Sequence, residues 1–216
     1  MGLNKIILVQ HCQSEHHVNN MSGGWTDTPL TDLGKAQAEM IGQYLKEYID
    51  KNDYTLYSSD LIRARQTAQI IGKYLELEVF QEKGLREINT GVAAGQTKEW
   101  AKANRNPKLR AEFDIDYQEF CDGETWRQFY TRVCHCMEKI TDTEKGKNLL
   151  VVSHGGTIGY IVAWWMKFSV DMLEKAYFSS SVGGISILSK NNYQQNVINV
   201  FNDTSPVSVL SSNYKD

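Results

Sequence analysis

Short apolar runs alternate with polar, periodic segments along the chain. Runs of strand length lie at residues 5–10, 54–58, 77–80, 149–153, 184–189 and 196–201. Apolar residues at helical spacing fill the intervals, over residues 33–48, 61–75 and 125–140 and from about Gly156 onward. Strands that alternate with helices predict an α/β fold, a three-layer α/β/α sandwich around a mostly parallel sheet.

The length of the chain and its lack of linkers favour one domain over residues 1–216. The chain has 216 residues with only three prolines, and no repeat or linker interrupts it. Residues 89–123 are polar and irregular, so we interpret them as an insertion that caps the functional site. The insertion offers four aromatic side chains as candidate walls of that site: Trp100, Phe113, Tyr117 and Phe120.

The composition of the chain limits the kinds of partner that it is expected to bind. Hydrophobic residues make up 41% of the chain, charged residues 23%, and the formal charge is -3. This balance gives no strong field for nucleic acid or membrane, and no apolar run is long enough to span a bilayer. A strand-like segment already begins at Lys5, so we expect no signal peptide. The four cysteines lack the spacing of a disulfide scaffold, which favours a reducing, cytoplasmic location.

The tripeptide Cys134-His135-Cys136 suggests a metal site at first sight. It falls within the helical pattern at 125–140, and residues two apart on a helix do not face the same way. We therefore interpret it as plain helix and expect no metal.

Two histidines follow apolar strands in the same way. His11 comes directly after the run at 5–10, and His154 comes directly after the run at 149–153. Ligands of open α/β sheets bind at the carboxyl ends of the strands, so neighbouring strands would point both imidazoles into one crevice. Gly155 then opens a helix whose first N–H groups form an anion site.

An arginine and a glutamate accompany these histidines. Arg63 lies on the first turn of the helix that follows the run at 54–58, where its guanidinium could bind phosphate in a bidentate way. Glu87 follows the run at 77–80 and could protonate a leaving-group oxygen. Taken singly, each of these four residues would be an ordinary strand-end or surface residue.

Several motifs occur together in a known order. They are LVQHCQS at 8–14, GWTDTPLTDLG at 24–34, SDLIRARQTA at 59–68, LREI at 85–88, GET at 123–125, SHGG at 153–156 and NDTS at 202–205. Together they are similar to the phosphoglycerate mutase-like branch of the histidine phosphatase superfamily, and they cover nearly the whole chain.

The resemblance implies a role for each matched residue. His11 would accept the phosphoryl group, His154 and Arg63 would hold its oxygens, and Glu87 would be the general acid. Ser14 and Gly155 would help to bind the phosphate. The chemistry needs no metal or cofactor, because side chains supply the positive charge.

The chain departs from the family pattern at the phosphate clamp. Gln10 stands where the family has arginine, Cys12 where it has glycine, and His17 where it has asparagine. We expect Gln10 to donate through its amide, and a protonated His17 to supply part of the missing charge. A cysteine phosphatase is excluded because the arginine that its loop needs is absent after Cys12.

The resemblance favours hydrolysis of a small phosphorylated metabolite, with inorganic phosphate as product. The tyrosine-bearing insertion of the mutases is absent after Glu87. Two alternatives stay open: phosphoryl transfer of the mutase type, and a weakened member that only binds phosphate and regulates. A homodimer also stays open.

Overall fold

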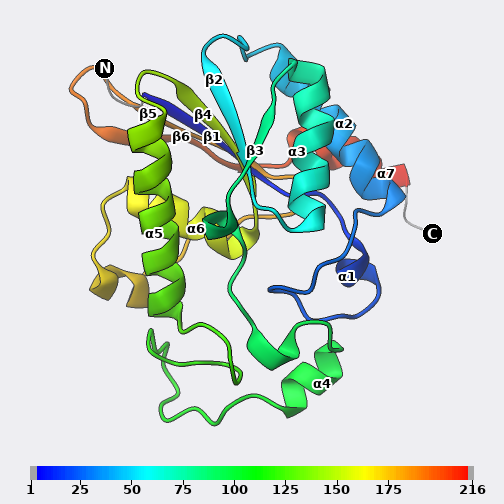
Figure 1. Cartoon of the computed structure of the whole chain (residues 1–216), viewed down its shortest axis with the longest axis vertical. Helices are drawn as coiled ribbons and strands as arrows, with labels where there is room; N and C mark the ends of the chain where they lie inside the picture. Colours follow the sequence, from blue (N-terminus) through cyan, green and yellow to red (C-terminus); the bar gives the residue numbers. More distant parts are fainter. Residues whose placement is uncertain (1–3, 214–216) are drawn as a thin grey trace.

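The computed structural model describes residues 4–213, which form one central six-stranded sheet (Figure 1). In sheet order the strands are β3 (Val79–Gln81), β2 (Tyr54–Ser58), β4 (Asn148–Ser153), β1 (Lys5–Gln10), β5 (Ile185–Lys190) and β6 (Asn196–Asp203). The first four are parallel, β5 runs antiparallel to β1, and β6 runs antiparallel to β5. The predicted, mostly parallel α/β sheet is thus confirmed.

Helices cover both faces of this sheet. On one face lie α2 (Asp32–Lys46), α3 (Ile62–Leu75) and α7 (Ser205–Asn213); on the other lie α5 (Trp126–Thr143) and α6 (Gly155–Trp165) (Figure 1). Because side chains of a strand alternate between faces, Ile7 and Val9 of β1 pack with the first group, and Ile6 and Leu8 with the second. This is the predicted three-layer sandwich.

Some helices and strands begin or end at other residues than predicted, because a helix cap fixes the boundary. The run predicted at 77–80 begins as a strand only at Val79, because Glu76 is left-handed and the Leu77 N–H bonds to the Gly72 carbonyl at the end of α3. The helix predicted at 125–140 extends to Thr143 after an N-cap at Thr125. The patterns missed α7 and the short helices α1 (Glu15–Val18) and α4 (Lys98–Ala103), as well as the 3-10 turns η1 (Lys83–Leu85), η2 (Gly91–Ala93) and η3 (Val170–Glu174).

The segment 89–123, which contains α4, packs on the loop that follows β1. The Gly95 N–H donates to Thr26 Oγ1, and Met21 pairs with Thr97. Of the four expected wall residues, Trp100 and Phe120 form a small core of the segment, and the Tyr117 hydroxyl donates to the Asn106 carbonyl. These three hold the segment together. Phe113 lines a cavity of about 490 Å³, and Phe113 and Tyr117 both line a much smaller one beside it. No helix of residues 4–213 is long and apolar enough to cross a membrane.

Candidate functional site

His11 and His154 meet at the carboxyl ends of two adjacent strands. The backbone N–H of His11 donates to the Ser153 carbonyl at 2.8 Å, and β1 pairs with β4 in parallel register. The two imidazole centroids are 5.0 Å apart at an interplanar angle of 62°. Both rings are buried. The expectation that neighbouring strands bring the two histidines together is confirmed.

The tautomer of His11 follows from its two partners. Its Nδ1 lies 2.8 Å from the Cys12 carbonyl, and its Nε2 lies 3.1 Å from Arg63 Nε. Arginine only donates, so Nε2 accepts and the ring proton sits on Nδ1. Burial, and then the charge of Arg63, hold the pKa of His11 well below its usual range. His11 is therefore a neutral imidazole with an unprotonated Nε2.

Arg63 lies at the start of α3 with its guanidinium buried. Nη1 donates to the Thr26 carbonyl at 2.6 Å and Nη2 to the Gly24 carbonyl at 2.8 Å. Burial lowers the pKa of Arg63 to about 10, so it stays a cation near neutral pH. Each terminal nitrogen keeps one further N–H for a ligand oxygen.

His154 caps the N-terminus of α6 and has one polar atom without a partner. Its Nε2 lies 2.8 Å from Ser59 Oγ, whereas its buried Nδ1 has no hydrogen bond within the part of the chain that the structure describes. Ser59 Oγ also accepts from the Leu61 N–H, which leaves the hydroxyl proton free to donate to Nε2. In the tautomer that carries its proton on Nδ1, an anionic oxygen would satisfy this atom. Burial, and then Arg63, lower the pKa of His154 well below its usual value.

Glu87 follows η1 and is tied to the start of α6. Its Oε2 accepts from the Gly156 N–H, and its Oε1 from the Ile88 N–H, both at 2.9 Å. Burial raises the pKa of Glu87, although both N–H groups and the charges of Arg63 and Arg132 oppose the shift. A carboxyl group with a raised pKa is suited to donate a proton.

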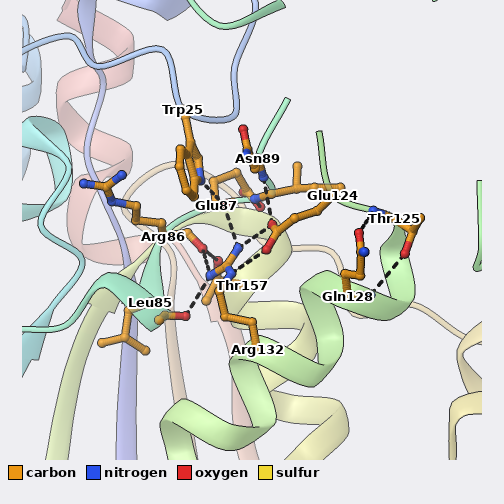
Figure 2. A network of polar contacts seen from close by, with 12 residues as sticks. Trp25, Leu85, Arg86, Glu87, Asn89, Glu124, Thr125, Gln128, Arg132 and Thr157 are labelled. Atoms are coloured by element: carbon orange, nitrogen blue, oxygen red, sulfur yellow. Dashed lines mark hydrogen bonds and ion pairs between the residues drawn. The ribbon is translucent and has the colours of Figure 1, made fainter. Parts of the chain in front are cut away.

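A polar network holds the backbone that carries Glu87 (Figure 2). Arg132 of α5 makes two 2.7 Å bonds to Glu124 and donates to the carbonyls of Gly84, Arg86 and Glu87. Trp25 Nε1 also donates to the Glu87 carbonyl at 2.8 Å. Sequence reasoning missed Arg132, because nothing in the helical pattern of α5 sets this arginine apart from others. Trp25 and Glu124 were part of quoted motifs, which was the available signal.

Gln10 lies beside the N-terminus of α6 with its side chain buried. Its Oε1 accepts from Ser180 Oγ at 2.6 Å. A Cβ placed on Gly155 would lie 3.3 Å from Gln10 Oε1 and 3.5 Å from Nε2. The side chain therefore reaches the helix terminus where phosphate is expected, although it brings no positive charge.

The loop after β1 brings two more histidines to His11. The rings of His17 and His11 stack with centroids 5.5 Å apart, and the His16 centroid is 6.0 Å from that of His11. Ser14 organises both: its N–H donates to His17 Nδ1 at 3.1 Å, and its Oγ lies 2.9 Å from His16 Nδ1. Ser14 thus shapes the loop from a buried position. Sequence reasoning missed His16, for which adjacency to His17 was the only signal.

The charge expected on His17 is not present in the ligand-free site. Burial, and then the charges of Arg63 and Lys98, lower the pKa of His17 to about 4. Because the Ser14 N–H donates to Nδ1, the proton of His17 sits on Nε2. The prediction of a protonated His17 used the pKa of an exposed imidazole, whereas burial and the neighbouring cations disfavour the protonated form. His17 can still donate one neutral N–H.

Cys12 is buried, and its N–H donates to Thr67 Oγ1 at 3.1 Å. Burial raises the pKa of its thiol to about 12. A thiol that keeps its proton is a poor nucleophile, which agrees with the exclusion of a cysteine phosphatase.

Comparison with known proteins agrees with this geometry. The model of the histidine phosphatase superfamily (branch 1) matches residues 6–204. The chain therefore belongs to this superfamily of enzymes, whose members among its relatives include phosphatases and phosphoglycerate mutases.

Several curated relatives are about one-third identical to the chain over the aligned residues. A broad-specificity phosphatase of Saccharomyces cerevisiae is 32% identical over 188 residues, which cover 82% of this chain and 77% of that one. Phosphoglycerate mutase-like protein 4 of Arabidopsis thaliana is 32% identical over 159 residues, 71% of this chain and 67% of that one. A 2,3-bisphosphoglycerate-dependent phosphoglycerate mutase of Allorhizobium ampelinum is 32% identical over 186 residues, with 82% and 86% covered.

Solved structures share the fold. A mycobacterial glucosyl-3-phosphoglycerate phosphatase in complex with VO3 superposes with a TM-score of 0.77 at 23% identity, covering 93% of this chain and 100% of that one. The α-ribazole phosphatase of Shigella flexneri gives 0.76 at 20% identity, with 92% and 96% covered. The chain thus has the fold of these phosphatases.

Proposed function

We propose that this protein is a phosphomonoesterase that hydrolyses a small phosphorylated metabolite through a phosphohistidine on His11. The observation that carries the proposal is the state of His11: its Nδ1 proton is held by the Cys12 carbonyl, so its unprotonated Nε2 is available as a nucleophile. Arg63 contacts that atom, and His154 faces the same ring.

The first step transfers the phosphoryl group to the enzyme. His11 Nε2 attacks phosphorus, the N–P bond forms and the bond to the ester oxygen breaks. Glu87 gives its proton to the departing oxygen. Arg63, His154 and the Gly155 N–H at the start of α6 meet the charge on the phosphoryl oxygens.

The second step returns the enzyme to its starting state. Water attacks phosphorus, the N–P bond breaks, and Glu87 takes the proton that it gave up. The products are an alcohol and inorganic phosphate. All charges come from side chains and the backbone, so the scheme uses no metal or cofactor.

One feature of the sequence supports hydrolysis over mutase-type transfer. The segment after Glu87 lacks the insertion by which the mutases place a tyrosine near the acid and hold the phosphoenzyme away from water. The curated relatives include a broad-specificity phosphatase and a phosphoserine phosphatase as well as phosphoglycerate mutases.

Turnover of p-nitrophenyl phosphate by wild type and His11→Ala tests the proposal. We expect a loss of at least about a thousandfold in kcat in His11→Ala, whereas the exposed His135→Ala keeps wild-type activity. Rapid quenching should trap a phosphoenzyme that is labile in acid and stable in base. Phosphate binding without turnover would indicate a regulatory protein, and transfer to a phosphoglycerate faster than release to water would indicate a mutase.

A further inference from the structure

An aromatic cavity lies against α6, the helix whose first turn binds Glu87. It measures about 490 Å³, which is within the range of small-molecule pockets. Its apolar walls come from four parts of the chain, namely the segment 89–123, α5, α6 and the stretch around η3: Phe113, Trp126, Tyr160, Leu173 and Tyr177. The rings of Phe113 and Trp126 contact each other with centroids 5.8 Å apart.

The helix α6 links this cavity to Glu87. Gly156 donates its N–H to Glu87, and Tyr160 lies four residues further on, one turn along the same helical face. The Phe129 ring bridges the two positions: its centroid is 4.9 Å from that of Tyr160, and its Cε1 would lie 3.1 Å from a Cβ at Gly156. The negative charge of Glu87 also contributes, after burial, to raising the pKa of Tyr177 to about 12.

We propose that this cavity receives the leaving group, so that the enzyme prefers phosphomonoesters of alcohols that carry an apolar, aromatic-sized group. The inference rests on the proposed function, because it uses Glu87 as the acid. A general acid must lie within hydrogen-bond reach of the oxygen that departs. The carbon skeleton attached to that oxygen therefore starts beside Glu87 and continues into the adjoining space.

The other hollow near the site is less suited to an apolar leaving group. It measures about 540 Å³, lies next to His17 and is lined mainly by polar side chains, including Gln13, Gln37 and Ser181. Its walls come from the loop after β1, from α2 and from residues 181–182 and 204–208, whereas Glu87 is held by α6 and α5. An apolar group placed there would forgo both the acid and the aromatic contacts.

A matched pair of substrates tests the inference. 3-Phenylpropyl phosphate and propyl phosphate release alcohols of similar acidity, so they differ in the phenyl ring and not in the need for Glu87. We expect kcat/KM to be about tenfold or more higher for 3-phenylpropyl phosphate, because burial of a ring of this size removes a large apolar area from water.

Two wall variants locate the effect. Tyr177→Ala and Phe113→Ala remove partly exposed rings, so both should fold, which circular dichroism and Tm can verify. Each should lower the ratio of the two kcat/KM values to about threefold or less. Tyr193→Ala, which removes an exposed ring in the β5–β6 turn, is the control and should keep the wild-type ratio.

The outcomes separate this inference from the proposed function. Turnover of both substrates at equal kcat/KM would overturn the inference and leave the phosphatase assignment standing. A preference that survives both wall variants would show that another surface holds the ring. No turnover of any monoester would overturn the proposed function, and this inference with it.

Discussion

Arg63 Nε donates a 3.1 Å hydrogen bond to His11 Nε2, the atom proposed to attack phosphorus. The same guanidinium donates to the carbonyls of Gly24 and Thr26, so the loop after β1 fixes its plane. One cation therefore keeps the nucleophile unprotonated and stands where phosphoryl oxygens must arrive. An incoming phosphate has to take over the Arg63 N–H groups before Nε2 can reach phosphorus.

Arg63→Lys tests how far this arrangement depends on the planar guanidinium group and its several N–H donors. A lysine keeps the charge but cannot serve His11 and two carbonyls at once. We expect kcat/KM to fall by at least about a hundredfold, for p-nitrophenyl phosphate and alkyl phosphates alike, because Arg63 acts on the phosphoryl group. Arg65→Lys, two residues along α3, is the control. A loss confined to poor leaving groups would place Arg63 outside the phosphoryl site.

Glu87→Gln should behave differently. The amide keeps similar size but cannot donate the catalytic proton, so alkyl phosphates should lose about a hundredfold or more in kcat while p-nitrophenyl phosphate loses far less. Equal losses for both substrates would remove Glu87 from the role of acid.

The dependence of activity on pH tests the same roles of His11 as nucleophile and Glu87 as acid. The pKa of His11 is lowered, so the nucleophile stays neutral well into the acidic range; the pKa of Glu87 is raised, so the acid keeps its proton above the usual range of a carboxyl group. Activity on an alkyl phosphate should be highest at mildly acidic pH and fall as pH rises through the pKa of Glu87. A profile of kcat/KM from pH 4 to 9 measures this, and an alkaline limb unchanged in Glu87→Gln would contradict it.

How much could be predicted from sequence differs between the fold and the site. Apolar periodicity is local, so it predicted the strands that carry His11 and His154. The antiparallel placement of β5 next to β1 depends on long-range packing, which periodicity does not encode. The partners of Arg63 are backbone carbonyls, which every residue has, so no side-chain pattern could single out Gly24 and Thr26. The pKa of His17 depends on burial, which sequence spacing does not give.

Gln10→Arg should restore a permanent charge beside Gly155. We expect inhibition by inorganic phosphate to tighten by about tenfold or more, since a charged donor replaces a neutral one in a buried site. The ligand-free variant should be less stable, because a second buried cation joins Arg63. Inhibition constants and unfolding midpoints measure the two effects, with the uncharged Gln10→Met as control. Unchanged inhibition in both variants would mean that Gln10 does not contact phosphate.

Arg132→Met tests the network that supports Glu87. It leaves the largely buried Glu124 carboxylate without its bidentate partner and frees three carbonyls, so the free energy of unfolding should fall by about 2–4 kcal/mol. Arg127→Met, on the same helix, breaks an exposed ion pair with Asp116 and should cost under about 1 kcal/mol. A positioning role for Arg132 also predicts a larger loss of kcat for alkyl phosphates than for p-nitrophenyl phosphate. The Arg132→Met and Glu124→Gln double variant should recover part of the stability.

The cluster of histidines predicts an acid-sensitive fold. His11, His154 and His16 are buried with lowered pKa values, about 3 for His16, whereas an unfolded chain titrates them near ~6.5. Such neutral, buried histidines contribute their full stabilisation above pH ~6.5. As pH falls below that value the stabilisation is lost, because the unfolded state binds more protons than the folded state.

Glu87 changes the free energy of unfolding in the opposite direction, because its raised pKa makes the folded state bind a proton before the unfolded state does. The contribution of the partly exposed His17 is reduced by solvent. With a net difference of roughly two protons, the free energy of unfolding should fall by about 3 kcal/mol per pH unit between pH 6 and 5. Urea unfolding at pH 7, 6 and 5 measures this slope. His16→Gln should lower it by about one proton and the exposed His135→Gln should leave it unchanged. Equal unfolding free energies at pH 7 and 5 would show that the buried histidines are not held neutral, and would remove the basis for an unprotonated His11 in the ligand-free enzyme.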